Sequence, residues 1–277
     1  MARIDVMTDR PIGVVDPRLF GGVLDETSPW SGPGGTRADL LAAVRDLGVT
    51  SVRWAAGVDP DQFMAWCSAA SAEPVLRLDL GTDTLDEALA WARDGVRFWA
   101  LGQDLPDGAD PELYVARARR WAKALRMADP GISLISCGQT GMDDWDRVVI
   151  DGLARYVDFH GVHLFTGSAD YWTNVLAPHY AERALSVAGA LIDRARYVQR
   201  IEREISVAYD AWNVSLGGGR LEERYNLADA LAVATYLNVF VRPDAVGVQS
   251  AKREVDGEYV DVTFSPHSFT LLEMRLA

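Results

Sequence analysis

Short apolar runs alternate along the chain with longer segments in which apolar residues recur every three or four positions. The short runs have the length of buried strands, and the longer segments have the period of helices that bury one stripe. The predicted strands are residues 18–24, 51–54, 75–80, 97–102, 133–137, 157–163, 205–210 and 245–250. Such alternation is typical of repeated strand–helix units around a parallel sheet.

Residue types at the ends of the helical segments support this interpretation. The segment 36–48 ends at Gly48, and the segment 110–130 ends before Pro130. Eight strands, each followed by a helix, predict a (β/α)8 TIM barrel, and we expect residues 1–277 to form this single domain. An open doubly wound sheet is the runner-up, but the first strand is followed by no Gly-x-Gly-x-x-Gly motif.

Two segments fall outside the repeating unit. Residues 4–15 suggest a short hairpin that closes the bottom of the barrel. Residues 253–264 carry Asp256-Gly257 between alternating residues, which predicts a hairpin insertion near the face that carries the site.

Composition narrows the partners. The net charge of −13, without a cluster of Lys or Arg, argues against nucleic acid, and the most apolar run, residues 230–241, is too short to span a membrane. The first residues contain no apolar signal segment, so we expect a cytoplasmic protein. Cys67 and Cys137 are expected to be reduced buried thiols.

Polar and aromatic side chains gather where the predicted strands end. In a TIM barrel the chemistry is built at the carboxyl ends of the strands, and carboxylates, amides and Trp faces together suit the hydroxyls and C–H faces of a sugar. We predict that the substrate-binding side chains are Asp25, Trp30, Arg53, Trp54, Gln103, Tyr209, Asp210, Ala211, Trp212 and Gln249. Trp30, in a Gly- and Pro-rich loop, is expected to cover the ligand.

Several segments, in order, resemble the catalytic barrel of the retaining α-L-arabinofuranosidases of glycoside hydrolase family 51. The first is VDPRLFGGVLDE, followed by LGVTSVRWAAG, which is similar to the family's Leu-Arg-Trp-Pro-Gly-Gly strand. FWALGQD resembles its Gly-Asn-Glu strand, YVDFHGVHLF its His-Arg-Tyr strand and YDAWNV its nucleophile strand. The β-sandwich domain that usually accompanies this barrel is expected to be absent.

The resemblance places the family's acid/base glutamate at Asp104 and its nucleophile glutamate at Ala211. Retaining glycosidases need two carboxyl groups about 5 Å apart, and a methyl group cannot attack the sugar. Strand alternation directs Asp210 to the opposite face from residues 209 and 211 unless the strand end is bulged. The further departures from the family are Gln103 for Asn, Asp25 for Glu, Glu26 for His and Ala55-Ala56 for Pro-Gly.

Because several site positions differ together, we favour natural divergence. The chain would then perform acid–base chemistry, such as isomerisation, cyclisation, elimination or hydration, on a small sugar-like or natural-product substrate, without a covalent glycosyl-enzyme. Asp104 would move protons, with His163 or Glu26 as its partner. The Ala- and Arg-rich composition suggests a bacterium in which such barrels serve secondary metabolism.

Three alternatives stay open. Ala211 is a Glu→Ala knockout in a retaining arabinofuranosidase, or the chain is a sugar-binding pseudoenzyme, or it is an inverting hydrolase with Glu26 as the base.

The remaining candidate residues could also have purely structural roles. His163 fits either the pocket or the core, and His160 is expected to be buried structure. Arg53 is expected to brace carboxylates, with Asp79 and Asp210 as its acceptors. No metal site or cofactor is expected, since the sequence has no His-x-x-x-His spacing and His160 and His163 should lie on opposite faces of a strand.

Overall fold

The computed structural model describes residues 16–24, 31–32, 35–54, 59–92, 96–102, 109–214 and 225–241. The chain divides into two compact units. One unit consists of Phe20–Leu164 and Ala184–Trp212, and the other contains the remaining residues.

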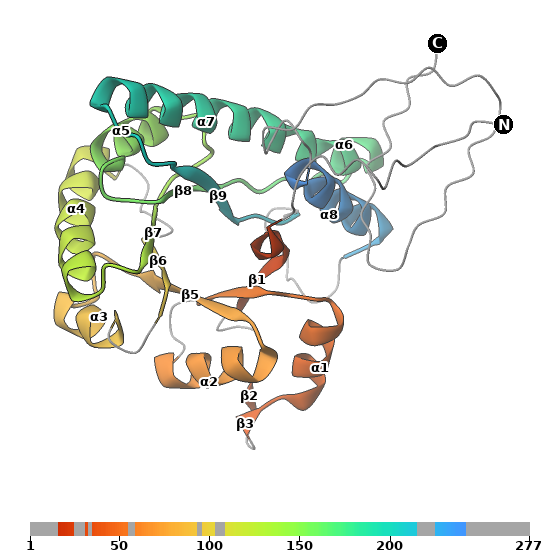
Figure 1. Cartoon of the computed structure of the whole chain (residues 1–277). Helices are drawn as coiled ribbons and strands as arrows, with labels where there is room; N and C mark the ends of the chain where they lie inside the picture. The colour runs from red at the N-terminus through yellow and green to blue at the C-terminus, as the bar shows by residue number, and fades with distance from the viewer. Residues whose placement is uncertain are drawn as a thin grey trace, which may run out of the picture. The chain divides into compact units, whose positions relative to one another are not determined.

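A seven-stranded sheet forms the centre of the first unit (Figure 1). Its strands are β1 (Gly21–Leu24), β4 (Ser51–Trp54), β5 (Glu73–Leu78), β6 (Phe98–Leu101), β7 (Ser133–Ser136), β8 (Phe159–His163) and β9 (Ser206–Ala211). They pair in chain order, and every pairing is parallel. The curled sheet is consistent with a TIM-barrel domain.

Seven of the predicted strands are therefore confirmed, with shifts of up to three residues at their ends. Residues 17–20 form the 3-10 helix η1 (Pro17–Phe20), where a strand was predicted to begin at residue 18. A small antiparallel pair, β2 (Ser31–Gly32) with β3 (Gly35–Thr36), was not predicted. The predicted strand 245–250 and the hairpins at 4–15 and 253–264 lie outside the described residues.

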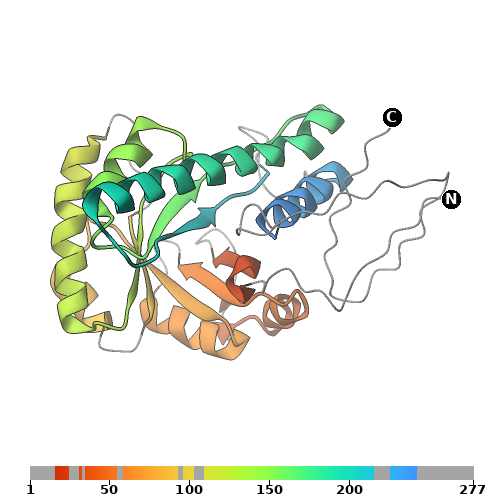
Figure 2. The same ribbon diagram turned by 45° about the horizontal axis from the view of Figure 1, so that its top comes forward.

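Helices follow the strands and cover one face of the sheet (Figure 2). They are α1 (Ala38–Asp46), α2 (Pro60–Ala70), α3 (Leu85–Ala92), α4 (Pro111–Ala128), α5 (Asp144–Leu153) and most of α7 (Tyr180–Gln199). α2 and α4 begin alike, because an Asp side chain caps the first turn and a Pro occupies the first helical position.

The main hydrophobic core lies between the sheet and these helices. Strand alternation sends Val52 and Trp54 of β4 into this layer, where Trp54 packs against Phe63 and stands edge-on to Trp91 at a centroid distance of 5.6 Å. Burial of an aromatic side chain of this kind contributes about 1.5–3 kcal/mol. The placement favours packing over the substrate-binding role that the sequence suggested for Trp54.

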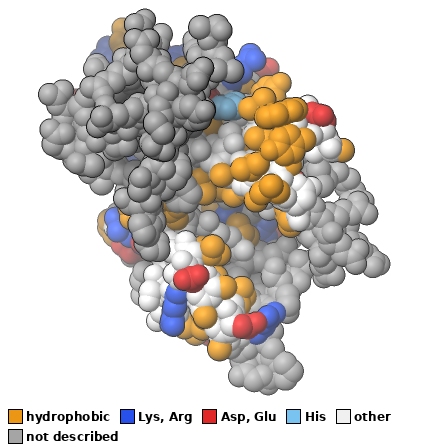
Figure 3. Space-filling view, turned by 90° about the vertical axis from the view of Figure 1, so that its right-hand side faces the viewer, with side chains coloured by type: hydrophobic (Ala, Val, Ile, Leu, Met, Phe, Trp, Pro, Cys, Tyr) orange, Lys and Arg blue, Asp and Glu red, His pale blue; other side chains and the backbone are white. Residues whose placement is uncertain are grey.

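The second unit contains α6 (Tyr171–Leu176), the 3-10 helix η2 (Ala177–His179), the first residues of α7 and α8 (Leu227–Phe240). Buried Asn174 donates a hydrogen bond to buried Asp229 at 2.7 Å, which joins α6 to the start of α8. The described residues of this second unit also expose large apolar side chains, which are Phe165, Tyr171, Trp172, Leu176, Tyr180, Tyr225, Leu227 and Leu231. Figure 3 shows apolar side chains gathered on the face that it views.

The helices and cysteines of the described residues bear on the class of protein. None of their helices is both long and apolar enough to cross a membrane. Cys67 and Cys137 are buried thiols that form no disulfide, and burial raises the pKa of the Cys67 thiol to about 12, as expected of inert core thiols.

Candidate functional site

Arg53 links two strand ends across the inner face of the sheet. Its Nη1 lies 3.1 Å from Oδ2 of Asp210 at the end of β9 and donates a hydrogen bond to the Asp210 carbonyl, also at 3.1 Å. Its Nη2 donates to the carbonyl of Gly102, directly after β6, at 3.5 Å. The ends of β4, β6 and β9 therefore converge on one buried guanidinium.

Asp210 is the carboxylate at the centre of this cluster. Its Oδ1 lies 3.1 Å from Nε2 of His163, and its side chain is 13% exposed. Burial raises the pKa of this carboxyl, but the Arg53 guanidinium and the contact with His163 together lower it more strongly, and the net pKa lies below the ordinary value of 3.8. Asp210 is therefore ionised at neutral pH.

The inward direction of Asp210 has a local cause in β9. Gly161 pairs with Ala208, but His163 pairs with Ala211, so β9 holds one extra residue between these two positions. Tyr209 packs instead toward Val162 and Ala184, in the layer between the sheet and α7. The sequence predicted regular alternation, with Tyr209 and Ala211 on the side that faces the site. The strand end is bulged instead, and Asp210 faces the site.

Arg53 has the bracing role that the sequence predicted, but with one of the two expected acceptors. Asp210 is its partner. Asp79 is exposed in the loop after β5, where its carboxylate accepts the Gly81 N–H at 2.8 Å.

Tyr114, which no sequence pattern singled out, joins two strand ends beneath the site. Its hydroxyl donates to the carbonyl of Leu101 at 2.7 Å and accepts the N–H of Cys137 at 2.7 Å. Burial, with smaller contributions from Cys137 and Asp210, raises the pKa of Tyr114 well above 10.0, so the hydroxyl keeps its proton. The next residue after Leu101, Gly102, has φ +107°, a conformation that favours glycine.

Other predicted site residues are only partly placed. Ala211 is buried, and its carbonyl accepts the N–H of Leu164 at 3.1 Å. Trp212 is half-buried. The predicted residues outside the described ranges are Asp25, Glu26, Trp30, Gln103, Asp104 and Gln249.

His160 is buried structure, as predicted. Its Nδ1 lies 2.9 Å from the Ser136 hydroxyl, and its Nε2 lies 3.0 Å from Oδ1 of Asp146. Asp146 also accepts the N–H groups of Gln139 and Asp143 at the start of α5. Although these residue types resemble a hydrolase triad, all three side chains are about 1% exposed or less, which excludes a substrate.

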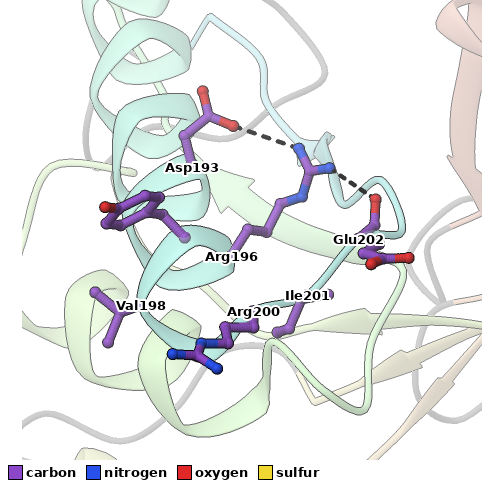
Figure 4. A pocket seen from close by; sticks show the side chains of 7 residues that line it. Asp193, Arg196, Val198, Arg200, Ile201 and Glu202 are labelled. Atoms are coloured by element: carbon purple, nitrogen blue, oxygen red, sulfur yellow. Dashed lines mark hydrogen bonds and ion pairs between the residues drawn. The ribbon is translucent and has the colours of Figure 1, made fainter.

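Two cavities in the described structure lie away from these strand ends. The larger, about 640 Å³, is lined at the end of α7 and before β9 by Asp193, Arg196, Tyr197, Val198, Arg200, Ile201 and Glu202. Figure 4 shows Arg196 between Asp193 and the Glu202 carbonyl, with contacts of 3.5 and 3.1 Å. Two Arg and two acidic residues balance in this lining, so it offers no surplus charge to a ligand.

Metal binding receives no support from the described part of the chain. No group of three or more His, Cys, Asp or Glu side chains comes together there in a way that would hold an ion.

Comparison with known proteins identifies proteins that are similar to this chain. α-L-Arabinofuranosidase C of Emericella nidulans is 32% identical over 331 residues, which cover 86% of this chain and 66% of that protein. Among solved structures, the α-L-arabinofuranosidase of Thermotoga maritima in its arabinose complex has a TM-score of 0.68 at 25% identity, over 81% of this chain and 59% of that one. No protein-family model matches.

A family 51 α-L-arabinofuranosidase from Bifidobacterium longum shares the fold, with a TM-score of 0.74 at 21% identity over 88% of this chain and 68% of that one. The chain is thus homologous to α-L-arabinofuranosidases. It spans less than two thirds of the length of the fungal protein and of the Thermotoga chain.

Proposed function

We propose that this chain, a homologue of α-L-arabinofuranosidases, binds an arabinofuranoside-like sugar at the carboxyl ends of its strands and hydrolyses the glycosidic bond by acid–base chemistry. Asp104 is the proton donor to the leaving oxygen. No covalent glycosyl-enzyme forms at position 211, because the methyl group of Ala211 cannot attack the anomeric carbon.

The contact of Arg53 with both β6 and β9 carries this proposal. Gly102, which accepts from Arg53, precedes Gln103-Asp104, and Asp210, its ion-pair partner, precedes Ala211. The two positions that matter to a glycosidase therefore follow strand ends held by one side chain. This supports a site at the carboxyl ends of the strands, where TIM-barrel enzymes carry their chemistry.

Hydrolysis is the reaction that the relatives favour. The proteins to which the chain is similar are named arabinofuranosidases. Nothing in these comparisons points to the isomerisation or cyclisation that the altered site residues suggested, so we propose the reaction of the relatives, run without their nucleophile.

Asp104→Asn tests the proton donor. Turnover of an alkyl arabinofuranoside, whose leaving group needs a proton, should fall by about 10²–10⁴-fold, while the dissociation constant for arabinose changes little. Asp107→Asn, three residues further on, is the matched control and should keep full turnover. Full turnover by the Asp104 variant excludes it as the acid, and arabinose binding without turnover by the unmodified chain indicates a pseudoenzyme.

A second candidate is a retaining arabinofuranosidase whose nucleophile has been changed to Ala211. The homology over 86% of the chain favours it, because the barrel segments are kept around a single lost carboxylate. Restoring that carboxylate with Ala211→Glu distinguishes the two candidates.

A further inference from the structure

We propose that His163 and Asp210 form the general base of this site. They activate a water molecule beside Ala211, so that the glycosidic bond is cleaved in one step with inversion at the anomeric carbon. The inference rests on the proposed hydrolysis and adds its base and its stereochemical outcome. The homologous retaining enzymes would instead use two steps and keep the configuration.

Neighbouring strands bring the three residues together. His163 ends β8 and lies opposite Ala211 of β9 in the sheet register. The bulge in β9 turns Asp210 to the same side, where its Oδ1 lies 3.1 Å from Nε2 of His163. A base at His163 is therefore next to the position that the lost nucleophile would occupy.

The contact with Asp210 bears on which nitrogen of the His163 imidazole carries the hydrogen. Arg53 keeps the carboxylate ionised, and an ionised carboxylate accepts hydrogen bonds but donates none. We therefore infer that the neutral form of His163 carries its hydrogen on Nε2, which lies 3.1 Å from Oδ1 of Asp210. The lone pair is then on Nδ1, which makes no hydrogen bond or ion pair within the described part of the chain.

His160, on the same strand, shows what a purely structural histidine looks like here. Both of its ring nitrogens have partners, Ser136 and Asp146, and its side chain is 1% exposed. Within the described residues, the His163 side chain contacts a partner at Nε2 alone, and it is 12% exposed. A histidine has the arrangement of a general base when a carboxylate orients one ring nitrogen and the other nitrogen can accept a proton.

In this inference the attacking water takes the space beside Ala211 that a glutamate side chain would occupy. Relative to glutamate, alanine lacks a carboxymethyl group, and a water molecule is smaller than the atoms removed. In an inverting glycosidase the base stands further from the acid than the nucleophile of a retaining enzyme does, because a water molecule lies between the base and the sugar. Glu26, the base suggested by the sequence, lies outside the described residues.

The step balances in protons and bonds. His163 Nδ1 takes a proton from water as the water oxygen bonds to the anomeric carbon. The bond from that carbon to the leaving oxygen breaks, and the oxygen takes its electron pair and a proton from Asp104. Transfer of a proton from His163 to Asp104 through solvent restores the starting state.

Two measurements test the base, one of them without a substrate. Nitrogen-15 NMR of the unmodified protein should show neutral His163 with its hydrogen on Nε2. Asp210→Asn and His163→Gln should each lower kcat by about 10²–10⁴-fold, and the double variant should lose little more, because the pair acts as a unit. His179→Gln is the matched control and should keep full activity.

Added methanol and azide distinguish one-step hydrolysis from the alternatives. One-step inversion yields free sugar only, whereas a covalent intermediate passes sugar to methanol, and a cavity left by a missing nucleophile admits azide and gives a glycosyl azide. Methyl glycoside, glycosyl azide or a hydrogen on Nδ1 of neutral His163 overturns the inference and leaves the proposed hydrolysis standing. If neither the unmodified chain nor Ala211→Glu hydrolyses an arabinofuranoside, the proposed function is overturned and the inference with it.

Discussion

Arg53 and Asp210 form an ion pair at 3.1 Å although 157 residues separate them in the chain. β4 and β9, which carry them, are separated in the sheet by four strands. The contact crosses the inner face, so it forms only because the sheet curls. It also keeps the Asp210 carboxylate, at the centre of the candidate site, negatively charged.

Breaking this pair should be costly. Arg53→Met leaves the buried Asp210 carboxylate without its main counter-charge, and we expect a loss of about 3–5 kcal/mol in the free energy of unfolding. Arg194→Met, which removes a half-exposed pair with Asp151, is the control and should cost less than about 1 kcal/mol. Urea titrations measure both, and equal small losses would show that the Arg53 contact is not a buried ion pair.

The same carboxylate predicts an acid-sensitive fold. The pKa of Asp210 is lower in the folded protein than its ordinary value of 3.8. Its contribution to stability is therefore fully present above that value and is lost as the pH falls below about 4 through the folded pKa. The free energy of unfolding should drop more steeply in this window for the unmodified protein than for Asp210→Asn, and parallel curves would contradict the assignment.

Tyr114→Phe removes only the hydroxyl that joins the end of β6 to the residue after β7. Leu101 loses a donor and the buried Cys137 N–H loses an acceptor, so we expect a loss of about 1–3 kcal/mol in the free energy of unfolding. Tyr197→Phe, at a side chain that is 86% exposed, is the control and should leave stability unchanged. Thermal and urea unfolding give both values.

Two glycines should respond oppositely to alanine. A Cβ on Gly138 would lie 1.9 Å from the Gly161 carbonyl and 2.7 Å from His160 Nε2, so Gly138→Ala should prevent folding or shift β8. A Cβ on Gly189, within α7, meets nothing within 4 Å, and Gly189→Ala should raise the free energy of unfolding by about 0.4–1 kcal/mol. Circular dichroism and urea titration check the pair, and a well-folded Gly138→Ala protein would be the contrary result.

The strands and their order were predictable because buried strands and helices with one apolar stripe leave distinct periods in the sequence. Arg53 as a brace followed from its place at a strand end. The substrate-binding role of Trp54 stays a prediction, although the alternation with Arg53 directs its side chain toward the helices.

Asp210 and Tyr114 show where sequence reasoning stops. The inward turn of Asp210 depends on one extra residue in β9, and a bulge leaves no mark in the apolar pattern of YDAWN. Tyr114 comes from the first turns of α4 and reaches two strand ends that are distant in the chain. Only the packed fold brings these groups together.

The central claim is that the chain turns over an arabinofuranoside without a nucleophile at position 211. Its most direct test compares the initial rate of aryl α-L-arabinofuranoside hydrolysis by the unmodified chain and by Ala211→Glu. We expect measurable hydrolysis by the unmodified chain and no large gain from the glutamate, because that side chain fills the space assigned to water. A gain of orders of magnitude from this one change would show instead that the protein is a retaining arabinofuranosidase lacking its nucleophile.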